Sequence, residues 1–332
     1  MDRRRFLLTS LAGALAAPRL LAAQPAPARA RVGFLTPSPR ASFAAGDRRR
    51  YLASFVDRLR ELGWTDGENL VIEGRYGEGQ YDRLPALAAE LVRVPVDVIF
   101  ANSAPAALAA KRATTTIPIV FETLGDPMSI GLVSSLARPG GNLTGVSGLG
   151  PELSGKRLEL LRELVPGLRR VVLLVNPGNV MTSPTVRETE KAAGAFGIKV
   201  QVLEVREAHQ LDRALGAVAG DGATAVIVVP DPFLLNHARR IQALLLRQRL
   251  PSVHAETGWG REGALMLFGS SLVDHYRQAA TFVDKILRGT EPGDLPVEQS
   301  TRFELIINSK TAKALGLTIP PSLLARADQI IE

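Results

Sequence analysis

Two long stretches of this chain alternate short β-branched apolar runs with segments whose apolar residues recur at helical spacing. In the first stretch, strands are predicted at 32–35, 70–76, 96–101 and 117–122, and helices around 51–62, 84–91 and 104–113. Such alternation is typical of a parallel sheet that is covered by helices on both faces. The sequence therefore predicts an α/β lobe in the first part of the chain.

The same alternation restarts at residue 152, after a turn-rich segment (RPGGNLTG) at 138–145. Strands are predicted at 171–175, 200–205, 225–229 and 252–254, and helices at 154–164, 183–196, 211–218 and 234–247. A tail then adds strands at 264–268 and 303–307 and helices at 276–287 and 309–315. The predicted fold class is α/β, with two Rossmann-like lobes of parallel sheet and a cleft between them.

The N-terminus has the pattern of an export signal. Arg3, Arg4 and Arg5 precede an apolar run at 6–17 that is too short to remain as a membrane span, and small residues lead to a cleavage point near Ala23. The order Arg-Arg-x-Phe-Leu fits a twin-arginine signal, and an ordinary secretory signal is the alternative. Residues 1–30 are thus interpreted as signal peptide and linker, and the mature protein as soluble and periplasmic.

Composition excludes several classes of function. The chain has no cysteine, which rules out disulfides, thiol nucleophiles and Cys-ligated metals. Four basic residues and one acidic residue lie within the first 23 positions, so the net charge of +7 falls to +4 for the rest. Aromatic residues are only 5% of the chain, so we expect no nucleic-acid binding. The basic run at 48–50 is interpreted as a solvated helix face.

Ligands of open α/β sheets bind beyond the carboxyl ends of the strands, so the loops there are the candidate site. These loops are 36–38, 102–105, 123–127, 176–179, 231–233 and 254–256. Ser103 precedes a predicted helix, where free backbone N–H groups attract an anionic group, or it only caps that helix. Asp126 and Asp231 each precede a proline, and each either binds a ligand's ammonium group or forms a turn.

Three large aromatic residues have different expected positions. Trp64 follows the C-terminus of the first helix, away from the predicted cleft, and is expected to pack there. Trp259 and Phe233 lie nearer the predicted cleft and either cover an apolar ligand or pack the hinge.

Motifs of catalysis and of cofactor binding are incomplete. The glycines at 77 and 79 lack the third glycine of a dinucleotide fingerprint, and Gly155-Lys156 is followed by Arg157 instead of the Ser or Thr of a P-loop. The segment 145–149 lacks the second glycine of a nucleophile elbow. The four histidines have no metal-ligand spacing. We expect no catalytic residue, no cofactor and no metal.

Five stretches carry a resemblance that runs through the whole chain. They are YDRLPALAAELV (81–92), VDVIFANSAPAALAAK (96–111), IPIVFETLGDPMSIGLVSSLARPGGNLTGVS (117–147), ELSGKRLELLRELVP (152–166) and FELIINSKTAKALGLTIPPSLLARAD (303–328). In these the chain resembles bacterial ABC-transporter substrate-binding proteins of the tryptophan/tyrosine-binding type. The loop at 102–105 departs from the Gly/Thr-Pro pattern that is frequent in that group, so the amino-acid specificity does not follow automatically.

The resemblance implies a periplasmic binding fold of type I, with two lobes, three hinge crossings and a ligand trapped by closure. The implied lobes are 31–146 plus 257–297 and 147–256 plus 298–332, with crossings near 144–147, 256–258 and 296–300. It implies a small-molecule ligand, an inner-membrane ABC permease as partner, and a monomer. The implied ligand contacts are Thr36, Ser38, Asn102, Ser103, Thr123, Asp126, Asn176, Ser183 and Asp231.

The leading hypothesis is an exported, non-catalytic receptor that delivers a small polar molecule, such as an amino acid or small carboxylate, to an ABC importer. One alternative is a sensor that presents its ligand to a membrane receptor. Another is an exported enzyme, for which no nucleophile–base pair is visible. A cytoplasmic repressor of related fold would carry a helix-turn-helix of about 60 residues where the leader stands.

Overall fold

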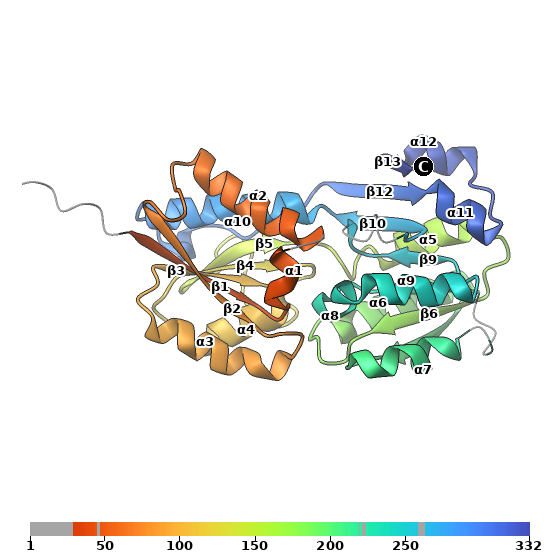
Figure 1. Cartoon of the computed structure of the whole chain (residues 1–332), viewed down its shortest axis with the longest axis horizontal. Coiled ribbons are helices and arrows are strands. Elements are labelled where there is room, and N and C mark those ends of the chain that lie inside the picture. Colours follow the sequence, from red (N-terminus) through yellow and green to blue (C-terminus); the bar gives the residue numbers. More distant parts are fainter. Residues whose placement is uncertain (1–28, 45–46, 219, 221–223, 258–262) are drawn as a thin grey trace, which may run out of the picture.

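The computed structural model describes residues 29–44, 47–218, 220, 224–257 and 263–332. The predicted export signal and Trp259 lie outside these residues. The described chain forms two α/β lobes that lie side by side (Figure 1). No helix within it is long and apolar enough to cross a bilayer. The prediction of two α/β lobes is confirmed.

In the described residues, a parallel six-stranded sheet forms the first lobe, in the order β11-β5-β4-β3-β1-β2. Its strands are β1 (Ala30–Thr36), β2 (Leu70–Tyr76), β3 (Val98–Asn102), β4 (Ile119–Thr123), β5 (Leu143–Ser147) and β11 (Glu298–Gln299). Its helices are α1 (Arg40–Ala44), α2 (Asp47–Glu61), α3 (Leu84–Arg93), α4 (Ala104–Ala113) and α10 (Leu272–Leu287), with 3₁₀ turns η1 (Tyr81–Arg83) and η4 (Pro292–Asp294).

Side-chain alternation along the strands explains why helices cover both faces of this sheet. In β3, Phe100 stacks on Phe55 of α2 and meets Tyr276 of α10, whereas Ile99 and Ala101 pack with α3 and α4. Because both faces are buried, the strand is apolar at every position from 98 to 101.

The second lobe has, over its described residues, a seven-stranded sheet in the order β13-β12-β10-β9-β8-β6-β7. Its neighbours are parallel except for β10 and β12. Its strands are β6 (Arg170–Val175), β7 (Lys199–Glu204), β8 (Ala225–Val228), β9 (Ser252–His254), β10 (Met266–Ser270), β12 (Phe303–Asn308) and β13 (Gln329–Ile331). The helical elements are α5 (Ser154–Leu164), α6 (Thr182–Ala195), η2 (Ala208–Gln210), α7 (Leu211–Gly216), α8 (Pro232–Asn236), α9 (Ala238–Arg247), α11 (Ser309–Leu315) and α12 (Pro321–Arg326).

The chain crosses between the lobes in three places within the described residues. The crossings are the segment 148–153 between β5 and α5, Ser271 between β10 and α10, and the segment 300–302 between β11 and β12. The first and third lie within a few residues of the expected positions. The second lies some 13 residues beyond the expected crossing near 256–258.

Strand pairing explains the displaced second crossing and corrects the lobe boundaries. Met266 and Leu267 of β10 pair with β9, so 263–270 belongs to the second lobe and not to the first. Glu298 of β11 pairs with Val146 of β5, so 298–299 stays in the first lobe. Periodicity marks 264–268 as a strand but does not show which sheet that strand joins. Glu298 pairs with a strand far upstream in sequence, and such pairing leaves no local signal.

The sequence pattern also misses β5, which begins inside the turn-rich segment at 138–145. The prolines and glycines of RPGG obscure the short strand that follows them. Gly145 is needed there because a Cβ at this position would lie 2.1 Å from the Phe121 carbonyl oxygen of β4. The strand matters for function because its end starts the first crossing.

Candidate ligand-binding site between the lobes

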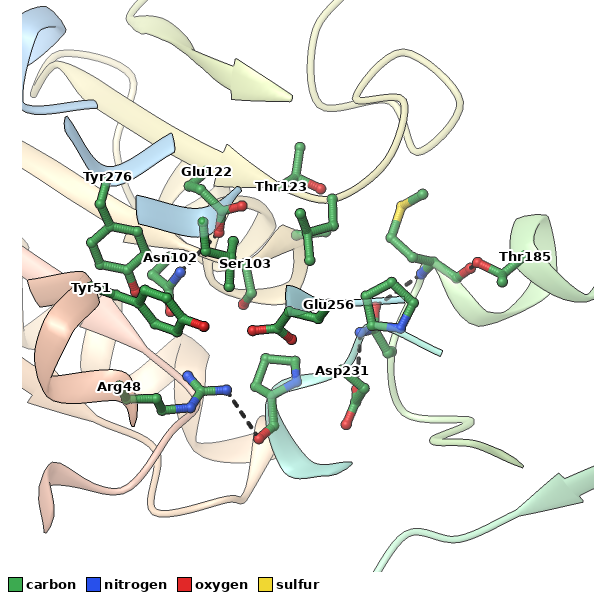
Figure 2. Close-up of a pocket in the computed structure, with 17 residues that line it drawn as sticks. Arg48, Tyr51, Asn102, Ser103, Glu122, Thr123, Thr185, Asp231, Glu256 and Tyr276 are labelled. Atoms are coloured by element: carbon green, nitrogen blue, oxygen red, sulfur yellow. Dashed lines mark hydrogen bonds between the residues drawn. The ribbon is translucent and has the colours of Figure 1, made fainter. Parts of the chain in front are cut away.

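A cavity lies where the carboxyl ends of both sheets face each other (Figure 2). It offers about 50 Å³ to the centres of water molecules, and a water needs roughly 10–15 Å³ of such volume. The cavity therefore has room for a small ligand. Its lining is formed by Arg48, Tyr51, Asn102, Ser103, Ala104, Glu122, Thr123, Leu124, Asn179, Met181, Thr185, Pro230, Asp231, Pro232, Glu256, Leu272 and Tyr276.

On the first lobe, a chain of buried polar side chains joins three strand ends to α10. The Thr36 hydroxyl donates to Asn102 Oδ1 at 3.1 Å, and Asn102 Nδ2 donates to Glu122 Oε2 at 2.9 Å. The other carboxylate oxygen of Glu122 lies 3.1 Å from Nδ1 of His275. Register places Asn102 beside Glu122 on β3 and β4, so the pairing follows from the sheet. Glu122 is thus held by its own lobe.

Ser103 stands between β3 and α4 in a strained conformation. Its φ of 93° and ψ of 154° fall in a region that glycine adopts far more easily than other residues. The first N–H groups of α4, at Ala104 and Ala106, have no carbonyl partner within the helix. The Ser103 hydroxyl and the nearby Thr123 hydroxyl are buried, and neither has a hydrogen-bond partner in the described chain. The first lobe therefore presents free donors to the cavity.

On the second lobe, Asp231 is fully supplied with hydrogen bonds. Its carboxylate accepts from Tyr81 at 2.7 Å, Asn179 at 3.0 Å, Asn176 at 3.5 Å and the Leu234 backbone N–H at 3.0 Å. The last of these caps α8. Burial raises the pKa of Asp231 above its ordinary value, against these stabilising donors. Asp231 therefore acts as a structural centre of its loop as well as a wall of the cavity.

Glu256 differs from Glu122 and Asp231, whose carboxylates are hydrogen-bonded. It follows β9 and is 3% exposed, and among the described residues its Oε1 has no hydrogen-bond partner. Burial, as the largest cause, raises the pKa of Glu256 to about 8. Figure 2 shows its carboxylate pointing toward the side of the cavity where Ser103, Tyr51 and Arg48 lie.

Arg48 corrects the interpretation of 48–50 as a solvated face. Arg49 and Arg50 are exposed, but Arg48 is 8% exposed and lines the cavity from the first turn of α2. Its Nη1 donates to Ser38 Oγ at 2.7 Å, and its Nη2 donates to the Pro232 carbonyl at 3.3 Å. Arg48 therefore joins the first lobe to the second.

Two more hydrogen bonds connect the lobes. Tyr81 of the first lobe donates to Asp231, and the Ser42 hydroxyl donates to Asn236 Oδ1 at 3.1 Å. Together with the bond from Arg48, they hold the lobes in a closed arrangement.

The predicted site residues fall into three groups. Asn102, Ser103, Thr123 and Asp231 line the cavity. Thr36, Ser38 and Asn176 lie one hydrogen bond behind a lining residue. Asp126 and Ser183 are not part of the lining.

The two residues outside the lining have local roles instead. Asp126 accepts from the backbone N–H groups of Met128 and Ser129, so its carboxylate closes a turn. Ser183 is exposed and lies within the first turn of α6, which begins at Thr182. Phe233 is buried against His237 and does not line the cavity. Trp64 packs as expected, donating to Asp284 at 2.8 Å.

Sequence reasoning missed several lining residues, and their positions explain why. Glu122 ends a strand and Glu256 lies in one of the loops at the strand ends, so the strand-end rule points to their positions, although neither was named as a ligand contact. Arg48, Tyr51 and Tyr276 come from helices α2 and α10, where periodicity marks only packing. Asn179, Met181 and Thr185 lie around the start of α6, close to residues that were selected.

Comparison with known proteins agrees with this architecture. A sequence model of the family described as ABC transporter substrate binding protein matches residues 46–331. A tyrosine-binding protein of Clostridioides difficile (strain R20291) is 29% identical over 265 residues, which are 79% of this chain and 75% of that protein.

Solved structures extend the likeness to the whole fold. A conserved domain protein of Vibrio cholerae has 27% identity and a TM-score of 0.84, with 91% of this chain and 99% of that chain covered. An ABC domain of Streptococcus pneumoniae in complex with L-Trp has 24% identity and a TM-score of 0.83, with 91% and 100% covered. A ligand-free, open substrate binding protein of Clostridium difficile has 25% identity and a TM-score of 0.63, with 91% and 99% covered.

The structural neighbours also include a 5-methylthioribose transporter solute binding protein of Thermotoga lettingae and an ABC sugar transporter subunit of Rhodobacter sphaeroides, at TM-scores of 0.57 and 0.59. The expected fold, a periplasmic binding fold of type I, is confirmed. Because the family model covers most of the sequence, this chain belongs to the ABC transporter substrate binding proteins.

Proposed function

We propose that this protein is an exported receptor that encloses a small polar solute between its lobes and delivers it to an ABC importer. The observation that carries the proposal is the closed cavity at the carboxyl ends of both sheets, with buried polar atoms from each lobe that lack partners within the described chain. A buried polar group without a partner is costly, so a ligand that supplies the missing hydrogen bonds stabilises the closed form.

The ligand's acceptor group, such as a carboxylate, binds at Ser103. The supporting features are the free Ser103 and Thr123 hydroxyls and the N–H groups at the start of α4, a helix of ten residues whose dipole favours negative charge. Asn102 orients this end of the site because Thr36 and Glu122 fix both ends of its amide.

An amino acid is the ligand class that we propose. The tyrosine-binding relative and the L-Trp complex of a structural neighbour support this class. The loop at 102–105 departs from the pattern that is frequent in this group, so we treat the preferred side chain of the ligand as a property of this chain.

A thermal-shift panel tests the receptor function. Purified mature protein is heated with each of the twenty L-amino acids, small carboxylates and small amides at millimolar concentration. At least one compound should raise Tm in a concentration-dependent way. A ligand at 100 times its Kd increases the free energy of unfolding by about 2.7 kcal/mol. A folded protein that no compound stabilises would contradict the proposal.

Delivery to a membrane importer requires export, for which the first residues are the signal. Mass spectrometry of periplasmic protein should find a mature N-terminus between about residues 23 and 30. Changing Arg3 and Arg4 to Lys should stop export if the twin-arginine route is used, and undiminished export would assign the ordinary secretory route. Intact Met1-containing protein confined to the cytoplasm would contradict export by either route.

A further inference from the structure

Three buried acids line the cavity, and only one of them lacks compensation. Glu122 has Asn102 and His275, and Asp231 has four donors. Glu256 Oε1 has no partner among the described residues. The local deficit of donors is therefore confined to one carboxylate.

The nearest buried cation does not remove this deficit. Arg48 directs Nη1 to Ser38 and Nη2 to the Pro232 carbonyl, and within the described chain its Nε is without a partner. No ion pair between Arg48 and Glu256 occurs there within 4.0 Å. The guanidinium thus contributes a favourable field at Glu256 and no hydrogen bond.

The raised pKa of Glu256 supports the same view of its surroundings. Burial, together with the charges of Glu122 and Asp231, raises it, while Arg48 and Arg50 lower it. Tyr51 and Tyr276, from α2 and α10, also face Glu256: burial, and to a smaller extent the negative charge of Glu256, raises the pKa of both phenols. The closed cavity therefore disfavours an unpaired carboxylate at this position, and a positively charged donor placed there is strongly favoured.

We propose that Glu256 binds a protonated nitrogen of the ligand and thereby selects cationic or zwitterionic solutes over anionic ones of the same shape. This inference rests on the proposed receptor function and adds the group that decides its specificity. Ser103 comes from one lobe and Glu256 from the other, and both line the cavity (Figure 2), so a ligand that binds both side chains bridges the lobes.

Two matched series of compounds test this assignment by calorimetry. Each L-amino acid is compared with the 2-hydroxy acid of the same side chain, in which a neutral hydroxyl replaces the ammonium group. The wild type should bind the best amino acid about 30-fold or more tightly than its hydroxy acid, since losing a buried charge partner costs about 2–5 kcal/mol.

The Glu256→Gln variant should lose most of that preference, because its neutral amide no longer favours the ammonium. The control is Asp126→Asn, which removes an acid that closes a turn outside the cavity and should keep the full preference. Ligand-free Glu256→Gln should also melt no lower than wild type at pH 8.5, since it removes an unpaired buried charge. A lower Tm would assign Glu256 a structural role and overturn the proposal.

Two further outcomes separate the two proposals. A solute whose affinity does not depend on its ammonium group, or a Glu256→Gln variant with unchanged preference, would overturn the role of Glu256 and leave the receptor function standing. Failure of every compound to bind the folded wild type would overturn the receptor function, and this inference with it.

Discussion

The hydroxyl of Tyr81 donates a 2.7 Å hydrogen bond to Oδ2 of Asp231 across the gap between the lobes. Tyr81 belongs to η1 of the first lobe, and Asp231 precedes α8 of the second. Burial, as the main cause, raises the pKa of Tyr81 well above its usual range, so the phenol remains a donor at physiological pH. This bond exists only when the lobes are closed, so it contributes to closure and not to the stability of either lobe alone.

Tyr81→Phe should therefore weaken ligand binding with little change in the stability of the separate lobes. A hydrogen bond to a charged group contributes about 1.5–3 kcal/mol, which corresponds to roughly 10- to 150-fold in Kd. Calorimetry with the best compound of the panel measures the change. The control is Tyr76→Phe, since Tyr76 packs inside the first lobe against Phe34 and Phe43. Equal affinities for both variants and wild type would contradict the role of the bond.

The first crossing requires glycine at position 150. A Cβ on Gly150 would lie 2.1 Å from the Leu124 carbonyl oxygen, which also accepts the Gly150 N–H at 2.8 Å. Gly150→Ala should therefore displace the crossing, lower the stability by about 1–3 kcal/mol and weaken ligand binding. Urea denaturation and calorimetry measure the two effects.

Gly155→Ala is the matched control for that experiment. It lies in α5, and its Cβ would meet only Ala192 at 3.6 Å, an ordinary contact. Because alanine favours a helix interior, this variant should gain about 0.5–1 kcal/mol and bind normally. If Gly150→Ala behaves like Gly155→Ala, the close approach at the crossing is not restrictive.

Arg157 ties the first crossing to the strand that leads into the second. This fully buried residue of α5 donates from Nη1 to the Gly150 carbonyl at 2.6 Å and from Nε to the Phe268 carbonyl of β10 at 3.0 Å. Arg157→Met leaves both carbonyls buried without these donors, and the loss of stability should be about 2–4 kcal/mol. Arg162→Met, on the exposed side of the same helix, should cost less than about 1 kcal/mol. Equal losses in urea denaturation would contradict the account.

His254 should make the protein sensitive to acid. Burial lowers the pKa of His254 to about 3, from 6.5 in the unfolded chain. Between these values the unfolded chain binds a proton that the folded chain does not, so stability falls as pH decreases from 6.5 toward 3. The contribution is at most about 1.4 kcal/mol per pH unit. Thermal unfolding of wild type and His254→Gln between pH 7 and pH 4 should show a shallower slope for the variant. Equal pH dependence of Tm in wild type and His254→Gln would contradict this role of His254.

The fold was largely predictable because its signals are local. Strand β3 is apolar at every position from 98 to 101, and the adjoining helix α3 carries clear periodicity. β5 was missed because Pro139, Gly140 and Gly141 dominate its surroundings. β10 was placed in the wrong lobe because its apolar pattern marks a strand without showing which sheet it joins.

The site was predictable only where strand ends form it. Asn102, Ser103, Thr123 and Asp231 follow from that rule and line the cavity. Asp126 satisfies the same sequence pattern but turns its carboxylate to its own loop. Arg48 belongs to a helix whose neighbours Arg49 and Arg50 are exposed, so the sequence alone does not distinguish the buried guanidinium from its solvated neighbours.

A crystal structure grown with the best compound of the panel tests the central claim most directly. Our account predicts electron density for one molecule in the cavity, with its acceptor group at Ser103, its protonated nitrogen at Glu256 and the bond from Tyr81 to Asp231 intact. Density for the compound at another position, or an empty cavity in crystals at a saturating concentration, would contradict the account.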